Sequence, residues 1–207
     1  MGGQAVRLLV ATGNAGKLQE VREILAPLLV GGHELVSMAD LAIEAPDEPF
    51  NTFQENAAHK AAYGALKSGL WTIADDSGLC VDALGGGPGV KSARYADTDE
   101  ARRAKLLHEV GPVPASRRGA HFFCAVALSS PDGKRLFRAE GKVEGQIATA
   151  ARGTGGFGYD PLFLPLEVPV KTLAELPLEQ KNKLSHRGRA LERLSPVLLR
   201  LLHDGTL

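Results

Sequence analysis

The chain has 207 residues with 24 basic and 24 acidic side chains, so its formal net charge at pH 7 is zero. A chain of this length buries an apolar core without the help of disulfides or structural metals. It fits one compact domain or two intimately packed lobes. A neutral chain has no global attraction for nucleic acid or for an anionic membrane, so we expect it to bind neither.

The sequence also indicates a compartment. No apolar run approaches the roughly 20 residues of a membrane span, and the start of the chain lacks the charged and apolar regions of a signal peptide. Cys80 and Cys124 both lie in apolar runs, which favours two buried thiols in a reducing environment. We therefore expect a cytoplasmic protein without disulfides.

The first thirty residues predict a strand, a tight turn and a helix. Residues 6–11 are apolar apart from one arginine, which is typical of a central strand. Leucine and valine then recur at helical spacing from residue 17 to about residue 29, and Gly31 and Gly32 are expected to end that helix. Residues 12–17 therefore lie at the carboxyl edge of a strand, where open α/β sheets usually bind ligands.

The next segment predicts a second strand and a capped helix. Residues 34–37 are expected to form the strand, and residues 44–49 form an acidic loop that contains proline. Thr52 and Glu55 have the spacing of a capping box, which predicts a helix that runs to about Lys67, with Gly69 as its stop.

Two adjacent carboxylates follow a short apolar run. Residues 71–74 are expected to form a strand that ends at Asp75 and Asp76, and residues 79–84 read as a separate strand. Residues 85–89 are too rich in glycine and proline for either element, so we expect a loop there.

The middle of the chain predicts a helix and then a hairpin. Asp97 and Glu100 are expected to open a helix that ends before Gly111. Residues 121–128 and 135–143 are β-prone on either side of a Pro-Asp-Gly turn, which indicates an antiparallel pair.

The last third predicts a glycine-rich loop and two helices. The loop covers residues 153–158; Thr172 and Glu175 are expected to cap a short helix, and Ser185 to cap the final one. The elements together indicate a single α/β domain with a mixed sheet flanked by helices.

The turn at residues 12–17 is only superficially similar to a P-loop. Gly13 lies three residues before Gly16, and Leu18 replaces the hydroxyl that would hold magnesium, so a P-loop NTPase is disfavoured. Two interpretations stay open: an ordinary strand-to-helix turn, or a backbone nest that binds phosphate together with Lys17.

The carboxylate pair suits a divalent cation. If the strand continues, Asp75 and Asp76 point to opposite faces, so one faces the site and the other makes structural hydrogen bonds. Glu48 supplies a second oxygen ligand, and Mg²⁺ is commonly held by one or two carboxylates plus substrate phosphates. The alternative is that the two acids only form a turn.

Two further segments suit an organic anion. The glycine-rich loop at residues 153–160 places Phe157 and Tyr159 where they stack on a base or pack into the core. A basic run around His186 opposes the dipole at the start of the last helix, which favours a ligand with anionic or carbonyl groups over a merely solvated helix end.

Six collinear blocks carry a resemblance to a known family. The blocks are residues 11–17, 52–57, 74–78, 85–95, 153–161 and 185–188. They resemble the inosine triphosphate pyrophosphatase family, also called non-canonical purine NTP pyrophosphatases or dITP/XTP pyrophosphatases. The resemblance covers nearly the whole chain.

The resemblance implies a fold and an activity. The implied fold is an elongated mixed β-sheet flanked by helices, with two lobes around a central nucleotide-binding cleft. The implied enzyme is a homodimer that uses Mg²⁺ to hydrolyse ITP, dITP and XTP to the monophosphate and pyrophosphate. Such hydrolysis prevents incorporation of these nucleotides into nucleic acids.

The resemblance also implies which carboxylates act. Asp76 would be the catalytic residue and a metal ligand, and Glu48 the second metal ligand. Relatives often have glycine two residues after that glutamate, whereas Pro49 and Phe50 follow it here, so Asp47 stays open as the alternative ligand.

A set of nucleotide-binding residues follows from the same resemblance. The triphosphate would be bound by Thr12, Gly13, Asn14, Ala15, Gly16, Lys17 and Lys60. Ser77 would touch the substrate. The base and the nearby phosphate would be bound by Phe157, Gly158, Tyr159, Asp160, Lys181, His186 and Arg187.

Two other functions compete with this hypothesis. A degenerate relative would bind nucleotides as a sensing module without hydrolysis, and a Maf-type triphosphatase would have a different base selectivity. A panel of triphosphates with identification of the products separates all three.

Overall fold

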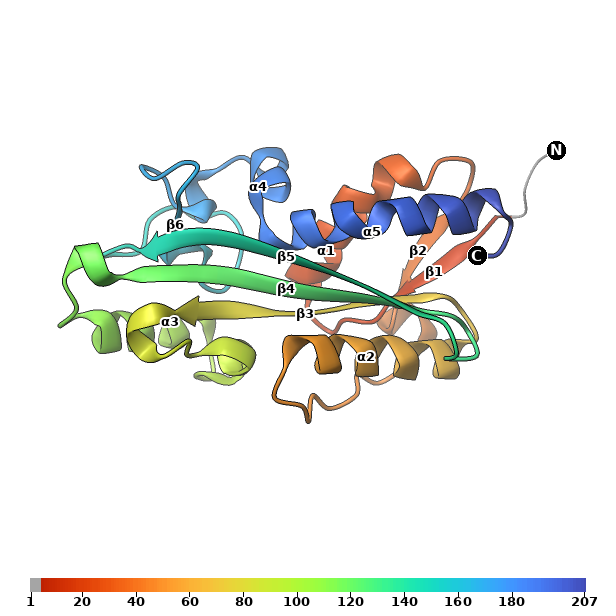
Figure 1. Cartoon of the computed structure of the whole chain (residues 1–207), viewed down its shortest axis with the longest axis horizontal. Helices are drawn as coiled ribbons and strands as arrows, with labels where there is room; N and C mark the ends of the chain where they lie inside the picture. Colours follow the sequence, from red (N-terminus) through yellow and green to blue (C-terminus); the bar gives the residue numbers. More distant parts are fainter. Residues whose placement is uncertain (1–4) are drawn as a thin grey trace. The chain divides into compact units, whose positions relative to one another are not determined.

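The structure of the protein is a computed structural model that describes residues 5–207 (Figure 1). The strands are β1 (Arg7–Val10), β2 (Glu34–Ser37), β3 (Thr72–Val81), β4 (Gly119–Ser129), β5 (Leu136–Ile147) and β6 (Phe163–Pro165). The α-helices are α1 (Ala15–Leu25), α2 (Phe53–Ser68), α3 (Asp99–Val110), α4 (Leu178–Leu184) and α5 (His186–His203). Within these residues, no helix is both long enough and apolar enough to span a membrane.

The sheet is mixed, as the sequence predicts. Its strand order is β2-β1-β3-β4-β5-β6, with β1 parallel to β2 and β3, and β5 antiparallel to β6. The chain divides into two compact units. Unit 1 comprises the residues up to 76 with 124–141 and 187–207, and unit 2 comprises residues 77–123 and 142–186.

Alternation along β1 builds the core of unit 1. Leu8 and Val10 pack with apolar residues of α1 and α5 in one buried cluster. The intervening Leu9 faces α2, where its side chain approaches Gly64. Since successive strand residues point to opposite faces, β1 is covered by α1 and α5 on one side and by α2 on the other (Figure 1).

Local signals set the ends of the helices in unit 1. Asn14 caps α1 by accepting a hydrogen bond from the backbone amide of Lys17 at 3.0 Å. Thr52 caps α2 through the amide of Glu55, and Gly69 ends it in a left-handed conformation with φ +70°. The predicted positions of both helices are confirmed, although α1 ends at Leu25 and a 3-10 turn follows it.

β3 corrects the prediction of two separate strands. It is one strand of 10 residues, and Asp75 and Asp76 lie in its middle instead of at its end. β3 pairs with β1 at Thr72 and Ile73, and it continues beside β4 through Ser77 and Gly78.

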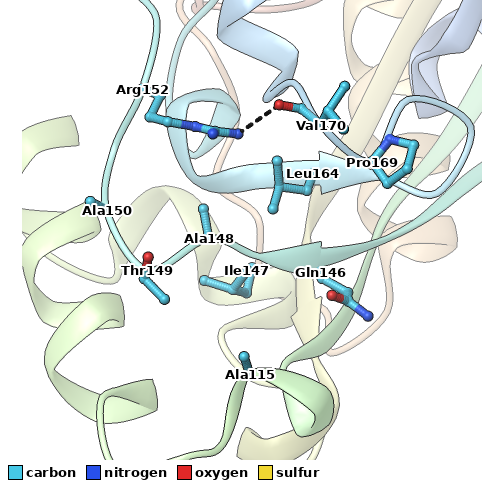
Figure 2. Close-up of a pocket in the computed structure, with 10 residues that line it drawn as sticks. All are labelled: Ala115, Gln146, Ile147, Ala148, Thr149, Ala150, Arg152, Leu164, Pro169 and Val170. Atoms are coloured by element: carbon cyan, nitrogen blue, oxygen red, sulfur yellow. Dashed lines mark hydrogen bonds between the residues drawn. The ribbon is translucent and has the colours of Figure 1, made fainter.

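Unit 2 has its own apolar core. Leu106 and Val110 of α3 pack with Leu79 and Val81 of β3, together with residues of β4, β5 and the segment after β5. A hollow of about 420 Å³ in this unit lies beside β5 and β6 (Figure 2). Among residues 5–207, those that line it include none of the predicted site residues.

The C-terminal part contains the final helix α5, which begins directly after Ser185 as the sequence predicts, and α4, which the sequence did not predict. α4 carries Lys181, and α5 begins at His186 after a break at Ser185. Ser185 is extended, with φ −67° and ψ 154°, so the basic run is divided between two helices. The predicted β4–β5 hairpin is confirmed: the backbone amide of Ser130 donates to the carbonyl of Arg135 at 2.9 Å across its turn.

Candidate functional site

The turn before α1 presents backbone to solvent. The hydroxyl of Thr12 accepts from the amide of Asn14 at 3.2 Å, and the Asn14 side chain then caps the helix. Residues 13–15 are exposed, at the N-terminus of a helix of 11 residues. The helix dipole at such a position favours an anion, which is the chemistry expected for this turn.

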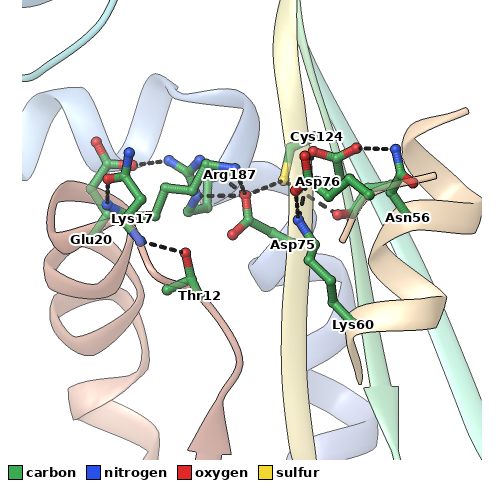
Figure 3. Close-up of polar contacts among 12 residues, drawn as sticks. Thr12, Lys17, Glu20, Asn56, Lys60, Asp75, Asp76, Cys124 and Arg187 are labelled. Atoms are coloured by element: carbon green, nitrogen blue, oxygen red, sulfur yellow. Dashed lines mark hydrogen bonds and ion pairs between the residues drawn. The ribbon is translucent and has the colours of Figure 1, made fainter. Parts of the chain in front are cut away.

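Asp75 lies in a buried ion-pair network (Figure 3). Its Oδ2 lies 3.2 Å from Lys17 Nζ and 3.0 Å from Arg187 Nη2. Arg187 is 1% exposed and also pairs with Glu20. Burial alone would raise the pKa of Asp75, but the cations of Arg187, Lys17 and Lys60 overcome it and hold the pKa well below its usual range.

Asp76 meets a different set of partners on the opposite face of β3. Its Oδ2 accepts from the Asn56 amide at 3.0 Å, and its Oδ1 lies 3.7 Å from Lys60 Nζ (Figure 3). The same Lys60 nitrogen lies 2.5 Å from Glu48 Oε1. Burial raises the pKa of Asp76, with Glu48 adding to the shift and Lys60 and Lys17 opposing it.

Lys60 stays charged in this environment. Desolvation alone would lower its pKa, but Asp76, Asp75 and Glu48 more than compensate, and the net shift is upward. The ammonium therefore persists as a cation between the carboxylates of Glu48 and Asp76.

Glu48 and Asp76 fit a divalent cation by the chemistry of this arrangement. Both carboxylates lie against one positive group, so a cation bound there has oxygen donors from two residues. Asp47 is exposed, while Glu48 is the one that contacts Lys60, which supports Glu48 as the ligand. Within residues 5–207 there is no cluster of three or more metal-binding side chains, and Mg²⁺ needs only one or two carboxylates plus substrate oxygens.

The loop predicted to bind the base is held together by Asp160 in unit 2. Asp160 Oδ2 accepts from the amide of Phe157 at 2.9 Å and pairs with Lys181 Nζ at 2.6 Å. Lys181 Nζ also lies 5.0 Å from the centre of the Phe157 ring. These three predicted residues are therefore brought together.

Two other predicted base contacts have structural partners. Tyr159 is buried, and its hydroxyl donates to the carbonyl of Ser92 at 3.0 Å, so its ring belongs to the core of unit 2. The His186 ring is stacked on Phe122, with centroids 4.7 Å apart and an interplanar angle of 8°. Phe122 thus fixes the plane of the imidazole.

The predicted site residues are divided between the two units. Unit 1 contains residues 12–17, Glu48, Lys60, Asp76 and Arg187. Unit 2 contains Ser77, residues 157–160, Lys181 and His186. Arg187 follows His186 directly, but its guanidinium is occupied by Asp75 and Glu20, and its expected contact with the base would require breaking those pairs.

Sequence reasoning missed two residues of the site in unit 1. Asn56 lies four residues before Lys60 on α2, so the helical repeat gave a signal that both side chains share one face. Glu20 gave no such signal, because its partner Arg187 is 167 residues away.

The fold and the site define a class of α/β proteins with a mixed sheet, a helix N-terminus suited to phosphate and paired carboxylates suited to a cation. The Ham1 family model matches residues 8–197, and the chain belongs to that family. It is 52% identical over 196 residues to a dITP/XTP pyrophosphatase of Geobacter sulfurreducens, covering 93% of this chain and 96% of that protein.

Solved structures agree with this assignment. The fold matches a HAM1 protein from Coxiella burnetii with a TM-score of 0.81 and 39% identity, over 94% of this chain and 99% of that one. It also matches a nucleoside-triphosphatase, or dITP/XTP pyrophosphatase, from Mycobacterium abscessus with a TM-score of 0.72 and 44% identity, over 92% and 100%.

Proposed function

We propose that the protein is a dITP/XTP pyrophosphatase, a hydrolase that converts ITP, dITP and XTP to the monophosphate and pyrophosphate. The observation that carries the proposal is the buried Asp76 with its raised pKa, placed with Glu48 around one cation in a member of the Ham1 family. The names of the relatives support the same activity. The role is to keep non-canonical purines out of nucleic acids.

The triphosphate is assigned to unit 1. The exposed turn of residues 13–15 and the ammonium of Lys17 bind phosphate oxygens, and Lys60 supports them. Glu48 and Asp76 would hold Mg²⁺, which when bound neutralises charge on the phosphates and fixes their orientation.

Asp76 is assigned as the base for an attacking water. Its raised pKa means that the ionised carboxylate is a better proton acceptor than an ordinary aspartate. Oxygen of the water forms a bond to the α-phosphorus, its proton passes to Asp76, and the bond from that phosphorus to the departing pyrophosphate breaks. Lys17 and Lys60 stabilise the charge on the leaving group electrostatically.

The base is assigned to unit 2. Phe157 stacks on it, while Gly158, Asp160, Lys181 and His186 recognise its edge, with Tyr159 anchoring the loop. A buried donor that meets O6 of an oxo-purine is left unpaired by the amino group of adenine, at a cost of roughly 1–3 kcal/mol.

Several further expectations belong to this proposal. Ser77 touches the substrate, Arg187 acts on the site through Asp75, and the whole chain functions as one nucleotide-binding domain. A homodimer in the cytoplasm, without binding to nucleic acid, stays a prediction from the family resemblance.

A panel of triphosphates tests the proposal. Purified protein with Mg²⁺ is incubated with ITP, dITP, XTP, ATP and GTP, and the products are separated by chromatography. We expect monophosphate and pyrophosphate from the first three at rates far above the last two. Diphosphate plus orthophosphate would rule out the assigned bond, broad base tolerance would favour a Maf-type triphosphatase, and tight binding without turnover a sensing module.

A further inference from the structure

Both backbone polar groups of Gly158 are bound by side chains of α3. The Gly158 amide donates to Asp99 Oδ2 at 2.8 Å, and the Gly158 carbonyl accepts from Arg103 Nη1 at 2.9 Å. Gly158 has φ +58°, a left-handed conformation that glycine adopts at little cost. One residue of the loop at residues 157–160 therefore makes two hydrogen bonds to side chains of one helix.

The geometry of α3 brings these two side chains together. Asp99 and Arg103 are four residues apart, so they lie on one face of the helix, whose first turn is fixed by the cap from Thr98 to the amide of Ala101. The second oxygen of Asp99 accepts from Arg102 Nη1 at 2.6 Å. An acid in the first helical turn is favoured by the helix dipole alone, but the dipole does not explain why Arg103 reaches the same residue.

These two hydrogen bonds restrain the loop whose residues are assigned to the base. Gly158 directly follows Phe157, whose amide is bonded to Asp160, and Asp160 is paired with Lys181. Gly156 also packs directly against Asp160, because a Cβ on Gly156 would overlap the Asp160 carboxylate. With Asp160 anchored from within, α3 adds a restraint from outside the loop on the backbone next to Phe157.

We propose that Asp99 and Arg103 are specificity-determining positioning residues that orient the loop of residues 157–160 for an oxo-purine base. They act through the Gly158 backbone and do not touch the reacting phosphorus. The proposal rests on the proposed function, because it takes the loop as the base-binding element. It adds that selectivity for the base depends on a helix that the sequence motifs do not include.

Binding measurements test this role independently of hydrolysis. The dissociation constants of ITP and ATP are measured by calorimetry in EDTA for the wild type and for Asp99→Ala, Arg103→Ala and Arg103→Met, and kcat and KM for ITP are measured with Mg²⁺. We expect each variant to weaken ITP binding about tenfold, the size of one charged hydrogen bond, with ATP affected less than twofold. The KM for ITP should rise with kcat nearly unchanged.

Two controls separate positioning from stability. Glu100→Ala removes an acid from the same helical turn at an exposed position and should leave ITP binding as in the wild type. Arg103→Lys keeps a donor for the Gly158 carbonyl and should restore most of the selectivity. Circular dichroism identifies a variant that does not fold. If Arg103→Ala does not fold, the ITP affinity of Arg103→Met decides the positioning role, since methionine keeps the apolar stem of the side chain.

Distinct outcomes overturn the two proposals. Unchanged ITP binding and selectivity in folded Asp99→Ala and Arg103→Met would overturn the positioning role, even if hydrolysis proceeds as proposed. A wild-type protein that binds ITP without hydrolysing it would overturn the proposed function, while the binding comparison still judges the positioning role. A wild type that binds no ITP would overturn both.

Discussion

Asp75 and Asp76 are neighbours in the chain and both are buried, yet their pKa values shift in opposite directions. The cause is the twofold repeat of β3, which directs one side chain toward Arg187 and Lys17 and the other toward Lys60 and Asn56. This division agrees with the expectation that one acid is structural. The sequence did not reveal which acid would have which partners.

Replacing the proposed base should abolish turnover. Asp76→Asn keeps an oxygen that accepts the Asn56 amide, so the fold should survive, while the loss of a general base lowers kcat by about 10²–10⁴. Initial rates with ITP measure the loss, and circular dichroism checks the fold. Activity close to wild type would exclude Asp76 as the base.

The pH dependence of activity should reflect the raised pKa of Asp76. Because a protonated Asp76 takes no proton from water, the acidic limb of kcat/KM should fall at a pH above 3.8, the ordinary value for the carboxyl group. Stopped assays with ITP from about pH 3 to pH 8 locate the limb. A limb at the ordinary value would contradict the role of burial at Asp76.

Asp75 should matter for stability. Its lowered pKa stabilises the fold above the unfolded value of 3.8, and this contribution is lost as the pH falls through the folded value. Asp75→Asn leaves the buried Arg187 without that partner, so we expect about 3–5 kcal/mol less stability at pH 7 and a smaller difference below about pH 4. Urea unfolding of the wild type and the variant, at pH 7 and below about pH 4, measures this difference in the free energy of unfolding. An equal difference at both would contradict the ionic origin.

At the scale of elements, α2 lies close to the sheet. A Cβ on Gly64 would lie 2.9 Å from Thr72 Cγ2 and 3.2 Å from both Ala11 Cβ and Leu9 Cδ2, so the helix approaches β1 and β3 through a residue without a side chain. The same helix carries Lys60 and Asn56 toward Asp76. Close packing therefore sets the position of the polar cluster.

Filling that contact should separate α2 from the sheet. We expect Gly64→Leu to cost at least about 1–3 kcal/mol, because the added side chain meets packed neighbours. Thermal unfolding of the variant and the wild type measures the shift in Tm. Leu66→Ala, at an exposed position of the same helix, serves as the control and should change stability little. Equal effects at both positions would exclude steric overlap as the cause.

Elements with local signals were predictable, and those set by distant partners were not. The cap at Thr52 and the stop at Gly69 located α2 to within a residue. Helix α4 was not predicted, because its seven residues are too few to show a clear helical repeat, whereas Ser185 correctly marked the start of α5. The contacts from side chains of α3 to Gly158 were not predicted either, since partners 55 and 59 residues apart leave no periodic pattern in the sequence.

At the scale of the whole molecule, each unit is assembled from separate stretches of the chain. The unit boundary falls inside β3, between Asp76 and Ser77. Length and composition were compatible with one domain or two lobes, and they did not reveal that β4 and β5 would each contribute to both units. The mixed sheet itself followed from the strand, helix and hairpin signals.

Removing divalent cations should stop the reaction of the whole enzyme. With Glu48 and Asp76 proposed as the protein ligands, we expect EDTA to reduce ITP turnover to background and added Mg²⁺ to restore it. Continuous detection of pyrophosphate follows both steps. Full turnover in EDTA, with the protein shown to be free of metal, would contradict the assigned ligands.

Lys60 has a consequence for the order of events during turnover. Its ammonium lies against both Glu48 and Asp76, so the resting protein offsets part of the repulsion between the two acids. An incoming Mg²⁺ competes with this tethered cation, which weakens its retention by the protein alone. A bound triphosphate would relieve the competition by offering Lys60 new oxygens, so the enzyme should retain Mg²⁺ better with nucleotide bound and carry little metal without it.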